Sequence, residues 1–519
     1  MPKTSDGDLT VMDWFCGAGG SSQGMHAVPG IRVERAANHW ERAIESHEAN
    51  FPDASHYRGD IRKAPVWAWP VTDIFWASPE CTNWSIAKGK QRDFNKAMQG
   101  DLLELYAEIE ASKFRNVGDD EDPQEPTSEE ESRALMEEVP LYLRGVIERG
   151  GLVKAGVVEN VVDVRQWDEW DRWIGEIHKM GYRTRLIALN SMHANPRSVH
   201  AAPQSRDRLY VAYWHESLGR TPDWDKWLRP RAWCSGCDAW VQAMQVFKAP
   251  GRDMGRYRQQ YVYRCPNVSC RNQVVEPEAL PALAAIDWSI PGQRIGDRAR
   301  PLADKTLARI RAGLDRFSRP VPTRTTESAV PPLLIPVEGR EGKEPRSAHD
   351  PLRTQTARNE TGLAWLPFIA ELRGGGSVAR SVTESLATVT ASGNHHGLVT
   401  PAGAQEHLLI PYYGTGVARS VKQPIGALST RDRYALVKGD IDVNDVLFRM
   451  LEPHEIGRAM SFADDYIVLG SKRERVKQYG NAVTPNASEI LVCALVEAIT
   501  GEELERYTSD SDGQFAVAA

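Results

Sequence analysis

The stretch VMDWFCGAGGSSQGM, residues 11–25, decides the fold. It places an apolar run that ends near Phe15 directly before a glycine-rich turn, and a stretch of helical composition follows. Gly17, Gly19 and Gly20 would let the backbone approach a ligand closely, as nucleotide-type cofactor sites at the first strand-to-helix turn require. Such turns also occur for packing or for phosphate binding, so the spacing alone leaves the kind of ligand open.

The first two hundred residues repeat this alternation of short apolar runs and amphipathic stretches. VTDIFWAS (71–78) and AGVVENVV (155–162) have strand composition, and WDEWDRWIGEIHKM (167–180) has the pattern of a helix. Strands and helices in alternation predict an α/β fold with a parallel sheet. Between the two runs, residues 117–138 contain ten acidic residues against one Arg, so we expect an acidic, flexible insertion there.

A chain of 519 residues exceeds what a single hydrophobic core usually organises. The α/β pattern ends near Trp214, and we expect a second, mainly β domain over residues 216–444. Within residues 319–438 a theme recurs that aligns on Thr325, Thr356, Thr390 and Thr430. These repeats either build a small sheet only or also carry loops that face a ligand, and the sequence leaves both open.

Composition and charge limit the class of protein. Hydrophobic residues make up 41% and charged residues 26%, and we expect a soluble, cytoplasmic protein without a membrane span or signal peptide. The net charge of -7 is unevenly divided, because residues 216–445 hold 31 Lys and Arg against 24 Asp and Glu, which is +7 and leaves -14 elsewhere. A basic module in an acidic protein is consistent with phosphate binding.

Four of the seven cysteines form two pairs, CSGC (Cys234 and Cys237) and CPNVSC (Cys265 and Cys270), with 27 residues between them. Four thiolates at these spacings suit tetrahedral zinc, whereas packing or redox roles are the alternatives. We call residues 230–275 the cysteine arm and expect it to resemble a zinc ribbon. It carries Arg and Tyr residues that would suit contact with duplex DNA, or else with a protein: Arg252, Arg256, Arg258, Arg264, Arg271, Tyr257, Tyr261 and Tyr263.

FCGAGGSSQGM resembles the first motif of the cytosine-5 DNA methyltransferase family, and further motifs of that family follow in the family's order. The resemblance implies a Rossmann-like sheet that binds S-adenosylmethionine, with Cys16 as a packing residue. AANHWERAIESHEANFP is similar to the family's second strand and helix, although Asn38 replaces the usual acidic residue. The implied cofactor contacts are Phe15, Gly17, Gly19, Gly20, Asn38, His39, Asp60, Ile61, Pro79, Asn481 and Val483.

Carbon 5 of cytosine is a poor nucleophile, and a thiolate that adds to carbon 6 makes carbon 5 electron-rich. Cys81 follows the apolar run VTDIFWA, the position that such a nucleophile needs, although a lone intracellular cysteine is more often structural. Pro79, Cys81 and Ser85 resemble the family's Pro-Pro-Cys-Gln motif. Glu80 and Thr82 depart from it, and Glu80 would oppose thiolate formation if it pointed inward.

A neutral carboxyl group near ring nitrogen 3 would assist the attack. Glu159 stands at the end of an apolar run, where carboxylates are commonly solvated, but Glu159, Asn160 and Val161 reproduce the family's Glu-Asn-Val signature. Arg206 and Arg208 are similar to its Gln-x-Arg-x-Arg element, which implies one arginine on the cytosine carbonyl and another on a phosphate or on Glu159.

YGNAVTPNAS, residues 479–488, resembles the family's last motif, so residues 1–215 and 445–519 together would form the catalytic domain. The resemblance implies a DNA (cytosine-5-)-methyltransferase that flips its target base out of double-stranded DNA. It would be a monomer, with a restriction enzyme as a possible companion. Cytosine modification in RNA, a variant cofactor, or a non-catalytic DNA-binding homologue are the alternatives.

Overall fold

The computed structural model of the chain describes most of residues 8–506. The described residues are 8–79, 129–280, 282–287, 289–290, 292–304, 307–308, 310, 333–336, 344–348, 350–355, 357, 361–365, 368–371, 379–381, 396–399, 408–411, 419–420, 434–437, 443–445 and 447–506. The expected nucleophile, its neighbours and the four repeat threonines lie outside them: Glu80, Cys81, Thr82, Ser85, Thr325, Thr356, Thr390 and Thr430.

A seven-stranded mixed sheet organises the first part of the chain. Its strands are β1 (Leu9–Trp14), β2 (Ile31–Asn38), β3 (Ser55–Arg58), β4 (Ile74–Ala77), β5 (Ala155–Asn160), β6 (Tyr182–Asn190) and β8 (Asp207–His215). The order is β3-β2-β1-β4-β5-β8-β6, and β8 alone runs antiparallel to its neighbours. This mixed α/β sheet agrees with the Rossmann-like methyltransferase sheet that the sequence predicts.

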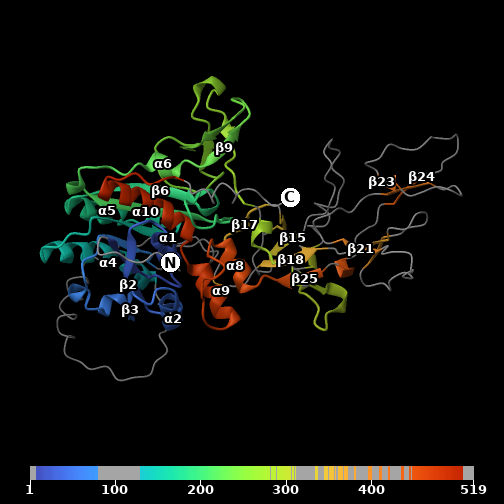
Figure 1. The fold of residues 1–519 in the computed structure, drawn as a ribbon, viewed down its shortest axis with the longest axis horizontal. Coiled ribbons are helices and arrows are strands. Elements are labelled where there is room, and N and C mark those ends of the chain that lie inside the picture. The colour runs from blue at the N-terminus through green and yellow to red at the C-terminus, as the bar shows by residue number, and fades with distance from the viewer. Residues whose placement is uncertain are drawn as a thin grey trace. The chain divides into compact units, whose positions relative to one another are not determined.

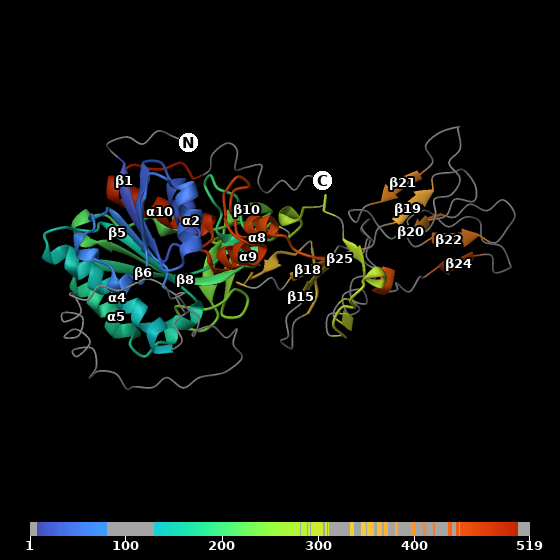
Figure 2. The ribbon, with the colours of Figure 1, turned by 90° about the horizontal axis from the view of Figure 1, so that it is seen from below.

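Helices cover both faces of this sheet (Figures 1 and 2). The α-helices of the described residues are α1 (Gly20–His26), α2 (Glu41–Asn50), α4 (Glu129–Glu148), α5 (Trp170–Lys179), α6 (Trp224–Leu228), α8 (Pro453–Ala459), α9 (Lys472–Asn481) and α10 (Pro485–Thr500). One face of the sheet packs with α4 and α5, and the other face packs with α1, α6 and α10. The three layers follow from the strand period of two, which sends alternate apolar side chains to opposite cores.

Two buried clusters form these cores. On β4, Phe75 and Ala77 face the core shared with α4 and α5, whereas Ile74 and Trp76 face the core shared with α10. The strand is buried on both faces, which explains its unbroken apolar run. Helix α10 contributes its residues from the far C-terminal region, so the two ends of the chain share one core.

The second part of the acidic stretch 117–138 is helical, whereas the sequence predicts a flexible insertion. Residues 129–138 form the first half of α4, and Leu135, Met136 and Val139 are buried. Their helical spacing turns one side of an otherwise acidic segment toward the core, and the acidic count concealed this apolar side. Residues 117–128 lie outside the described part of the chain.

The chain divides into two compact units, residues 1–280 with 457–519, and residues 281–456. The first unit includes the cysteine arm, which the expected boundary at 216 had assigned to the second domain. The arm contains β9 (Arg231–Cys234), β10 (Ala239–Gln242), β11 (Met244–Phe247), β12 (Tyr261–Arg264) and β13 (Val274–Val275). A two-residue strand, β7 (Gln204–Ser205), precedes β8.

The second unit contains three sets of three strands with the same pairing. In each set the first strand pairs antiparallel with both the second and the third. The sets are β15 (Leu333–Pro336), β16 (Arg346–Ser347) and β18 (Thr361–Trp365); β19 (Phe368–Glu371), β20 (Ala379–Ser381) and β21 (His396–Val399); and β22 (Leu408–Pro411), β23 (Arg419–Ser420) and β24 (Tyr434–Val437). The unit also holds β14 (Gln293–Arg294), β17 (Leu352–Arg353) and β25 (Leu447–Met450). All three sets lie within the stretch in which the sequence theme recurs.

The stretch Lys472–Thr500 is long and apolar enough, by composition alone, to cross a membrane. Its most apolar window has a mean hydropathy of 1.4, but 89% of that window is buried inside the protein. Core helices of soluble proteins pass the same test, and α10 packs within the sheet's core.

Candidate active site and cysteine cluster

The glycine-rich turn after β1 has an unusual backbone. Phe15, Gly17 and Gly19 have φ values of 58°, 53° and 93°. Glycine adopts this region freely, whereas Phe15 is strained there, a feature that clusters at functional sites. A methyl group placed on Gly17 would meet no atom of the described residues within 4 Å. The turn therefore presents open backbone at the switch point between β1 and β4, where α/β folds bind ligands.

The C-terminal part of the chain lies against this turn. A methyl group on Gly20 would stand 2.1 Å from the carbonyl oxygen of Val483, so only glycine fits there. The hydroxyl of Tyr466 donates to the carbonyl oxygen of Ala18 at 2.6 Å. Val483 is buried, and Asn481 is exposed at the end of α9. The structure thus brings the first and the last predicted cofactor contacts together.

The second set of predicted cofactor contacts follows β2 and β3. Asn38 and His39 are half-buried, and the Asn38 side chain accepts a hydrogen bond from the Trp40 amide at 2.9 Å. Asp60 pairs with Arg62 at 2.7 Å, while Ile61 is buried. Partial burial would raise the pKa of Asp60, but the hydrogen bonds and charge of Arg62 hold it below its ordinary value. Asp60 is therefore ionised and oriented by its neighbour.

The end of β4 leads toward Cys81. Pro79 is buried, and its carbonyl oxygen accepts a hydrogen bond from the Asn160 side chain at 3.3 Å. The Ser78 amide donates to the Trp14 carbonyl oxygen at 3.1 Å. The last described residue before position 80 therefore lies between the ends of β1 and β5. Cys81 itself is outside the described residues.

Glu159 and Arg208 form a mostly buried ion pair at the same edge. Arg208 Nε lies 3.1 Å from Glu159 Oε1, because β8 runs antiparallel to β5 and begins where β5 ends. Burial raises the pKa of the Glu159 carboxyl group above its ordinary value, although the charges of Arg208 and Arg206 oppose the rise. Such a carboxyl group takes up a proton more readily than a solvated one.

Arg206 has a different environment from its neighbour Arg208. It is buried, and its guanidinium group donates to the carbonyl oxygens of Gly480 at 3.3 Å and Ala482 at 3.0 Å. These contacts hold the turn that contains Asn481 and Val483. In the structure Arg206 joins the sheet to the C-terminal part of the predicted cofactor site, and Arg208 is the arginine that contacts Glu159.

A buried polar network under the glycine turn was missed by the sequence interpretation. Asp13 Oδ2 accepts hydrogen bonds from Ser21 at 2.6 Å and Ser22 at 2.7 Å, and Ser22 also contacts His47 Nε2 at 2.9 Å. His47 Nδ1 in turn contacts His56 at 2.8 Å. Burial raises the pKa of Asp13 to about 7 and lowers the pKa of His47 to about 3. A carboxylate inside an apolar strand was the available signal.

Asp13 also has a polar atom that lacks a partner. Its Oδ1 is buried and makes no hydrogen bond to any described residue.

Cys16 packs with Ala36 and Ile44, and burial raises the pKa of its thiol. Cys16 therefore has the surroundings of a packing residue.

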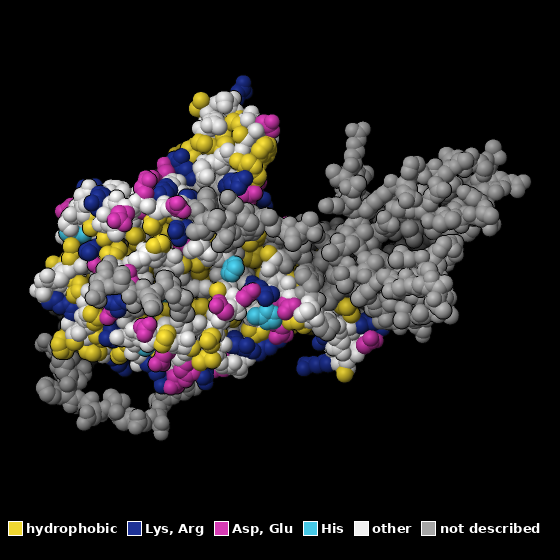
Figure 3. All heavy atoms as spheres, in the orientation of Figure 1, with side chains coloured by type: hydrophobic (Ala, Val, Ile, Leu, Met, Phe, Trp, Pro, Cys, Tyr) yellow, Lys and Arg dark blue, Asp and Glu magenta, His cyan; other side chains and the backbone are white. Residues whose placement is uncertain are grey.

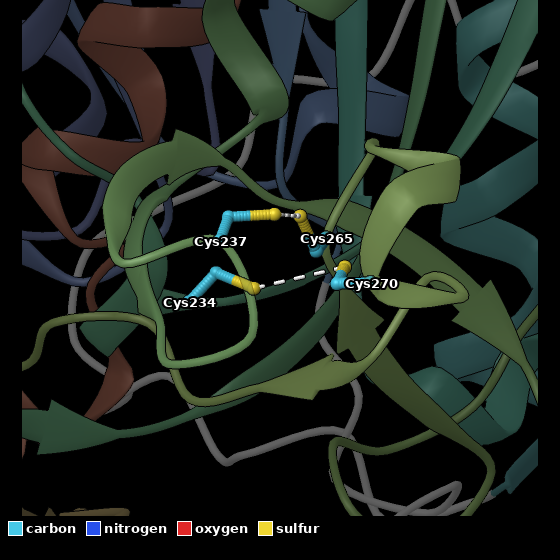
Figure 4. A group of neighbouring side chains, drawn as sticks. All are labelled: Cys234, Cys237, Cys265 and Cys270. Atoms are coloured by element: carbon cyan, nitrogen blue, oxygen red, sulfur yellow. Dashed lines mark hydrogen bonds between the residues drawn. The ribbon is translucent and has the colours of Figure 1, made fainter.

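The four paired cysteines converge into one cluster (Figure 4). Their sulfur atoms all lie within 4.8 Å of one another, and the Cys234–Cys270 and Cys237–Cys265 distances are both 3.8 Å. Tetrahedral zinc with Zn–S bonds of about 2.3 Å requires sulfur atoms about 3.8 Å apart, whereas a disulfide requires about 2.05 Å. All four are free thiols. The donor set and spacing fit a tetrahedral metal ion.

The aromatic residues that the cysteine arm exposes are not the ones that the sequence predicts. Tyr257, Tyr261 and Tyr263, which were expected to contact DNA, are buried. Alternation along β12 turns its tyrosines inward because the arm packs on the main sheet. The exposed aromatic residues are instead Trp233 and Trp240, which face each other across β9 and β10, each 44% exposed. Figure 3 shows hydrophobic and basic side chains along the projecting arm.

Residues 9–113 match the sequence model of the family described as C-5 cytosine-specific DNA methylase. This match confirms, over that segment, the resemblance found in the motifs. No curated protein matches the chain. Three solved structures that match the chain have identities of 11 to 13% and TM-scores of 0.41 to 0.44.

One such structure is the methyltransferase EhMeth of Entamoeba histolytica, with 11% identity, 94% of this chain and 98% of that chain covered, and a TM-score of 0.41. A second is DNMT2 of Spodoptera frugiperda, with 12% identity, coverage of 94% and 100%, and a TM-score of 0.44. A third is described as a DNA modification methyltransferase encoded within a prophage of E. coli, with 13% identity, coverage of 95% and 100%, and a TM-score of 0.41.

Proposed function

We propose that the protein is a DNA (cytosine-5-)-methyltransferase that uses S-adenosylmethionine and Cys81. The observation that carries the proposal is the family match over residues 9–113, a segment that contains both the glycine turn and Cys81. The geometry supports it, because the turn, the chain leading to Cys81, and the Glu159–Arg208 pair meet at one edge of the sheet.

The residues at this edge fit the cofactor. Gly17 leaves its backbone open, whereas Gly19 and Gly20 allow the C-terminal segment of the same chain to approach closely. The orphaned Asp13 Oδ1 adds a polar atom that needs a partner beneath the turn. The residues that would hold the cofactor are those predicted from the motifs: Phe15, Gly17, Gly19, Gly20, Asn38, His39, Asp60, Ile61, Pro79, Asn481 and Val483. When bound, S-adenosylmethionine supplies an electrophilic methyl group.

Cys81 and Glu159 divide the remaining chemistry. The Cys81 thiolate forms a bond to carbon 6 of the cytosine, and the electron pair displaced from the 5,6 double bond makes carbon 5 nucleophilic. Glu159, kept easier to protonate by burial, donates a hydrogen bond or a proton to ring nitrogen 3. Once carbon 5 carries the methyl group, its proton passes to solvent, the electron pair of that carbon–hydrogen bond re-forms the 5,6 double bond, and the carbon 6–sulfur bond breaks to release the Cys81 thiolate. Arg208 holds Glu159 in place.

Duplex DNA would be held by the second unit and the cysteine arm while the base is flipped into the site. The strand sets of residues 333–437 lie within the expected target-recognition region, 216–444. On the arm, Arg231 stacks over Trp240 at 4.3 Å, and such an exposed cation and aromatic pair suits contact with nucleic acid. We propose zinc in the cysteine cluster as the ion that folds this arm.

Release of tritium from carbon 5 of labelled cytosine tests the activity directly. The full chain with S-adenosylmethionine should release tritium from duplex DNA and not from RNA, and Cys81→Ser should release none. Cys493→Ala removes a thiol buried in α10 and serves as the matched control. Release from RNA alone would favour an RNA substrate. No release from either, with a folded protein, would overturn the proposal in favour of a non-catalytic DNA-binding protein.

A further inference from the structure

The cysteine arm shares a hydrophobic core with the face of the main sheet that carries α4 and α5. Its buried Tyr257, Tyr261 and Tyr263 belong to the same cluster as Val161 and Val211 of the sheet region. The ring of His193, which follows β6, packs edge-on against Tyr257, with ring centroids 4.4 Å apart, and against Tyr263 at 5.1 Å. The arm is therefore packed into the domain at its base, even though its tip projects (Figure 1).

Polar contacts from the arm reach two segments of the proposed active site. The Tyr257 amide donates to Asp207 Oδ1 at 3.0 Å, and Asp207 stands between Arg206 and Arg208. Arg256 pairs with Asp163 at 2.6 Å, and Asp163 follows Glu159 by four residues. The arm thus contacts the start of β8 and the segment after β5.

Two further contacts fix the same interface. Arg165 makes an ion pair with Asp253 at 2.9 Å, with further hydrogen bonds at 3.2 Å from Nε to both carboxylate oxygens. The Gln245 side chain donates to the carbonyl oxygen of Ala188 at 2.8 Å. Together with the contacts of Tyr257 and Arg256, these make four separate polar contacts of the arm. One is with β8, one is with β6, and two are with the segment that follows β5. Such redundancy fixes orientation as well as proximity.

The path from the arm to the proposed catalytic carboxyl group is short. The carbonyl oxygen of Asp207 accepts a hydrogen bond from Arg208 Nη1 at 2.9 Å, and Arg208 Nε contacts Glu159 at 3.1 Å. Asp207 is therefore held by the arm through its side chain and holds Arg208 through its backbone. A displacement of the arm would move the guanidinium group that orients Glu159.

The cysteine cluster fixes β12, the strand that directly follows the segment from which Asp253, Arg256 and Tyr257 make three of these contacts. β12 carries Tyr261 and Tyr263 and runs directly into Cys265, whose amide donates to the carbonyl oxygen of Gln273 at 2.9 Å. Cys234 ends β9, and Ala232 within the same strand forms an antiparallel bridge with Pro277. A metal ion bound by the four thiolates would tie both ends of the arm together near the sheet.

We propose that the cysteine arm is a positioning element of the active site, and that a metal ion in its cluster keeps Asp207 and Asp163 placed so that Arg208 orients Glu159. This inference rests on the proposed function and deepens it. It differs from the sequence interpretation, in which the arm contacts duplex DNA or else a protein. Asp207, Asp163 and Arg256 are positioning residues that would not contact the base, unlike Cys81 and Glu159.

Arg256→Ala removes the ion pair with Asp163 and leaves the cysteines and the catalytic residues intact. We expect kcat to fall about 10- to 100-fold, because misplacement by about 1 Å of a catalytic group costs this much, while KM for S-adenosylmethionine stays within about twofold. Asp163→Ala should act alike, and the double variant should be no worse than either single one. Arg258→Ala is the matched control, since Arg258 pairs with Glu276 outside the sheet and is well exposed.

The pH profile separates positioning from a general loss of structure. Arg208 and Arg206 oppose the rise in the pKa of Glu159 that burial causes, and Tyr210 is the other titratable group coupled to it. If the arm releases Arg208, the pKa of Glu159 rises further, and the alkaline limb of kcat moves to higher pH. Removal of the metal by a chelator should give the same fall in kcat and the same shift as Arg256→Ala. Unchanged kcat and pH profiles in Arg256→Ala, Asp163→Ala and the metal-free protein would overturn the proposal.

Hydrogen exchange of the full chain gives a readout that needs no activity. With zinc bound, the amides of residues 155–166 and 204–211 should be protected, and zinc removal should speed exchange there at least about tenfold more than in α10, the internal reference. Equal protection with and without zinc would overturn the positioning role. If the wild type proves inactive on DNA and RNA, the proposed function fails, and the exchange result still decides whether the arm supports this edge.

Discussion

Replacing Gly24 by alanine would place a methyl group where α1 meets α10. The added carbon would lie 2.0 Å from Ser488 Oγ and 2.1 Å from the carbonyl oxygen of Pro485. The serine hydroxyl can rotate away, but the Pro485 carbonyl group belongs to the backbone of the first turn of α10. We therefore expect α1 and α10 to be forced apart, which would disturb the core that joins the two ends of the chain.

The size of the effect follows from two opposing contributions. Alanine in place of glycine within a helix stabilises by about 0.5–1 kcal/mol. Overpacking a tight core costs about 1–3 kcal/mol, so the net result is a loss of about 1–2 kcal/mol. Gly175 in α5 is the matched control, because a methyl group there would meet no atom of the described residues within 4 Å. Gly175→Ala should therefore stabilise by about 0.5–1 kcal/mol.

Urea unfolding followed by far-UV circular dichroism measures both changes. Gly24→Ala should unfold at a lower urea concentration than the wild type, and Gly175→Ala at a higher one, with similar slopes. A Gly24→Ala protein that is as stable as Gly175→Ala would refute the close packing of α1 on α10. It would also remove one of the structural reasons for joining the two ends of the chain in one domain, alongside the contacts of Gly20 with Val483 and of Arg206 with Gly480.

Three further predictions concern other parts of the protein. Burial raises the pKa of Asp13 from 3.8 to about 7, so the wild type loses folding free energy as pH rises between these values. In urea unfolding, the free energy of unfolding of Asp13→Asn should therefore fall by about 2 kcal/mol less than that of the wild type between pH 5 and pH 8. Parallel pH dependences would contradict the burial of this carboxyl group. Metal analysis of the purified chain should find a single zinc ion, which Cys265→Ser loses or binds much more weakly; equal zinc content in both would exclude the cluster as the site. Joint replacement of Trp233 and Trp240 by alanine should weaken DNA binding about 10-fold or more in fluorescence anisotropy with a change in stability below about 1 kcal/mol, and unaltered affinity would count against the arm as a DNA contact.

The sheet and its glycine turn could be predicted because their signals are local. An apolar run, three glycines and a helical pattern follow one another within residues 11–25, and similar runs return at β4 and β5. Glu159 could be placed at a strand end for the same reason. These features depend on residues that are close in sequence, which single-sequence reasoning can evaluate.

Contacts between distant segments could not be predicted in the same way. Arg206 and Arg208 are the same residue type two positions apart, yet Gly480 and Ala482 bind the first while Glu159 binds the second. The alternation of Tyr and Arg in the cysteine arm is compatible with either face turned inward. Only the packing of the arm on the main sheet decides that the tyrosines are buried.

Acidic composition also concealed structure. Residues 129–138 look solvated by charge, but their apolar residues at helical spacing form the buried side of α4. Asp13 was overlooked because a single carboxylate hardly changes the apolar pattern of the strand that contains it. In both cases the tertiary environment, which the sequence does not state, determines the role of the charge.

Covalent trapping on duplex DNA with 5-fluorocytosine at the target site tests the central claim most directly. Fluorine at carbon 5 cannot leave as a proton does, so the sulfur–carbon bond should persist after methylation, and peptide mapping by mass spectrometry should locate the adduct on Cys81. The account predicts this adduct in the wild type with S-adenosylmethionine present, and none in Cys81→Ser. An adduct on another cysteine, or methylation of cytosine by Cys81→Ser at the wild-type rate, would contradict it.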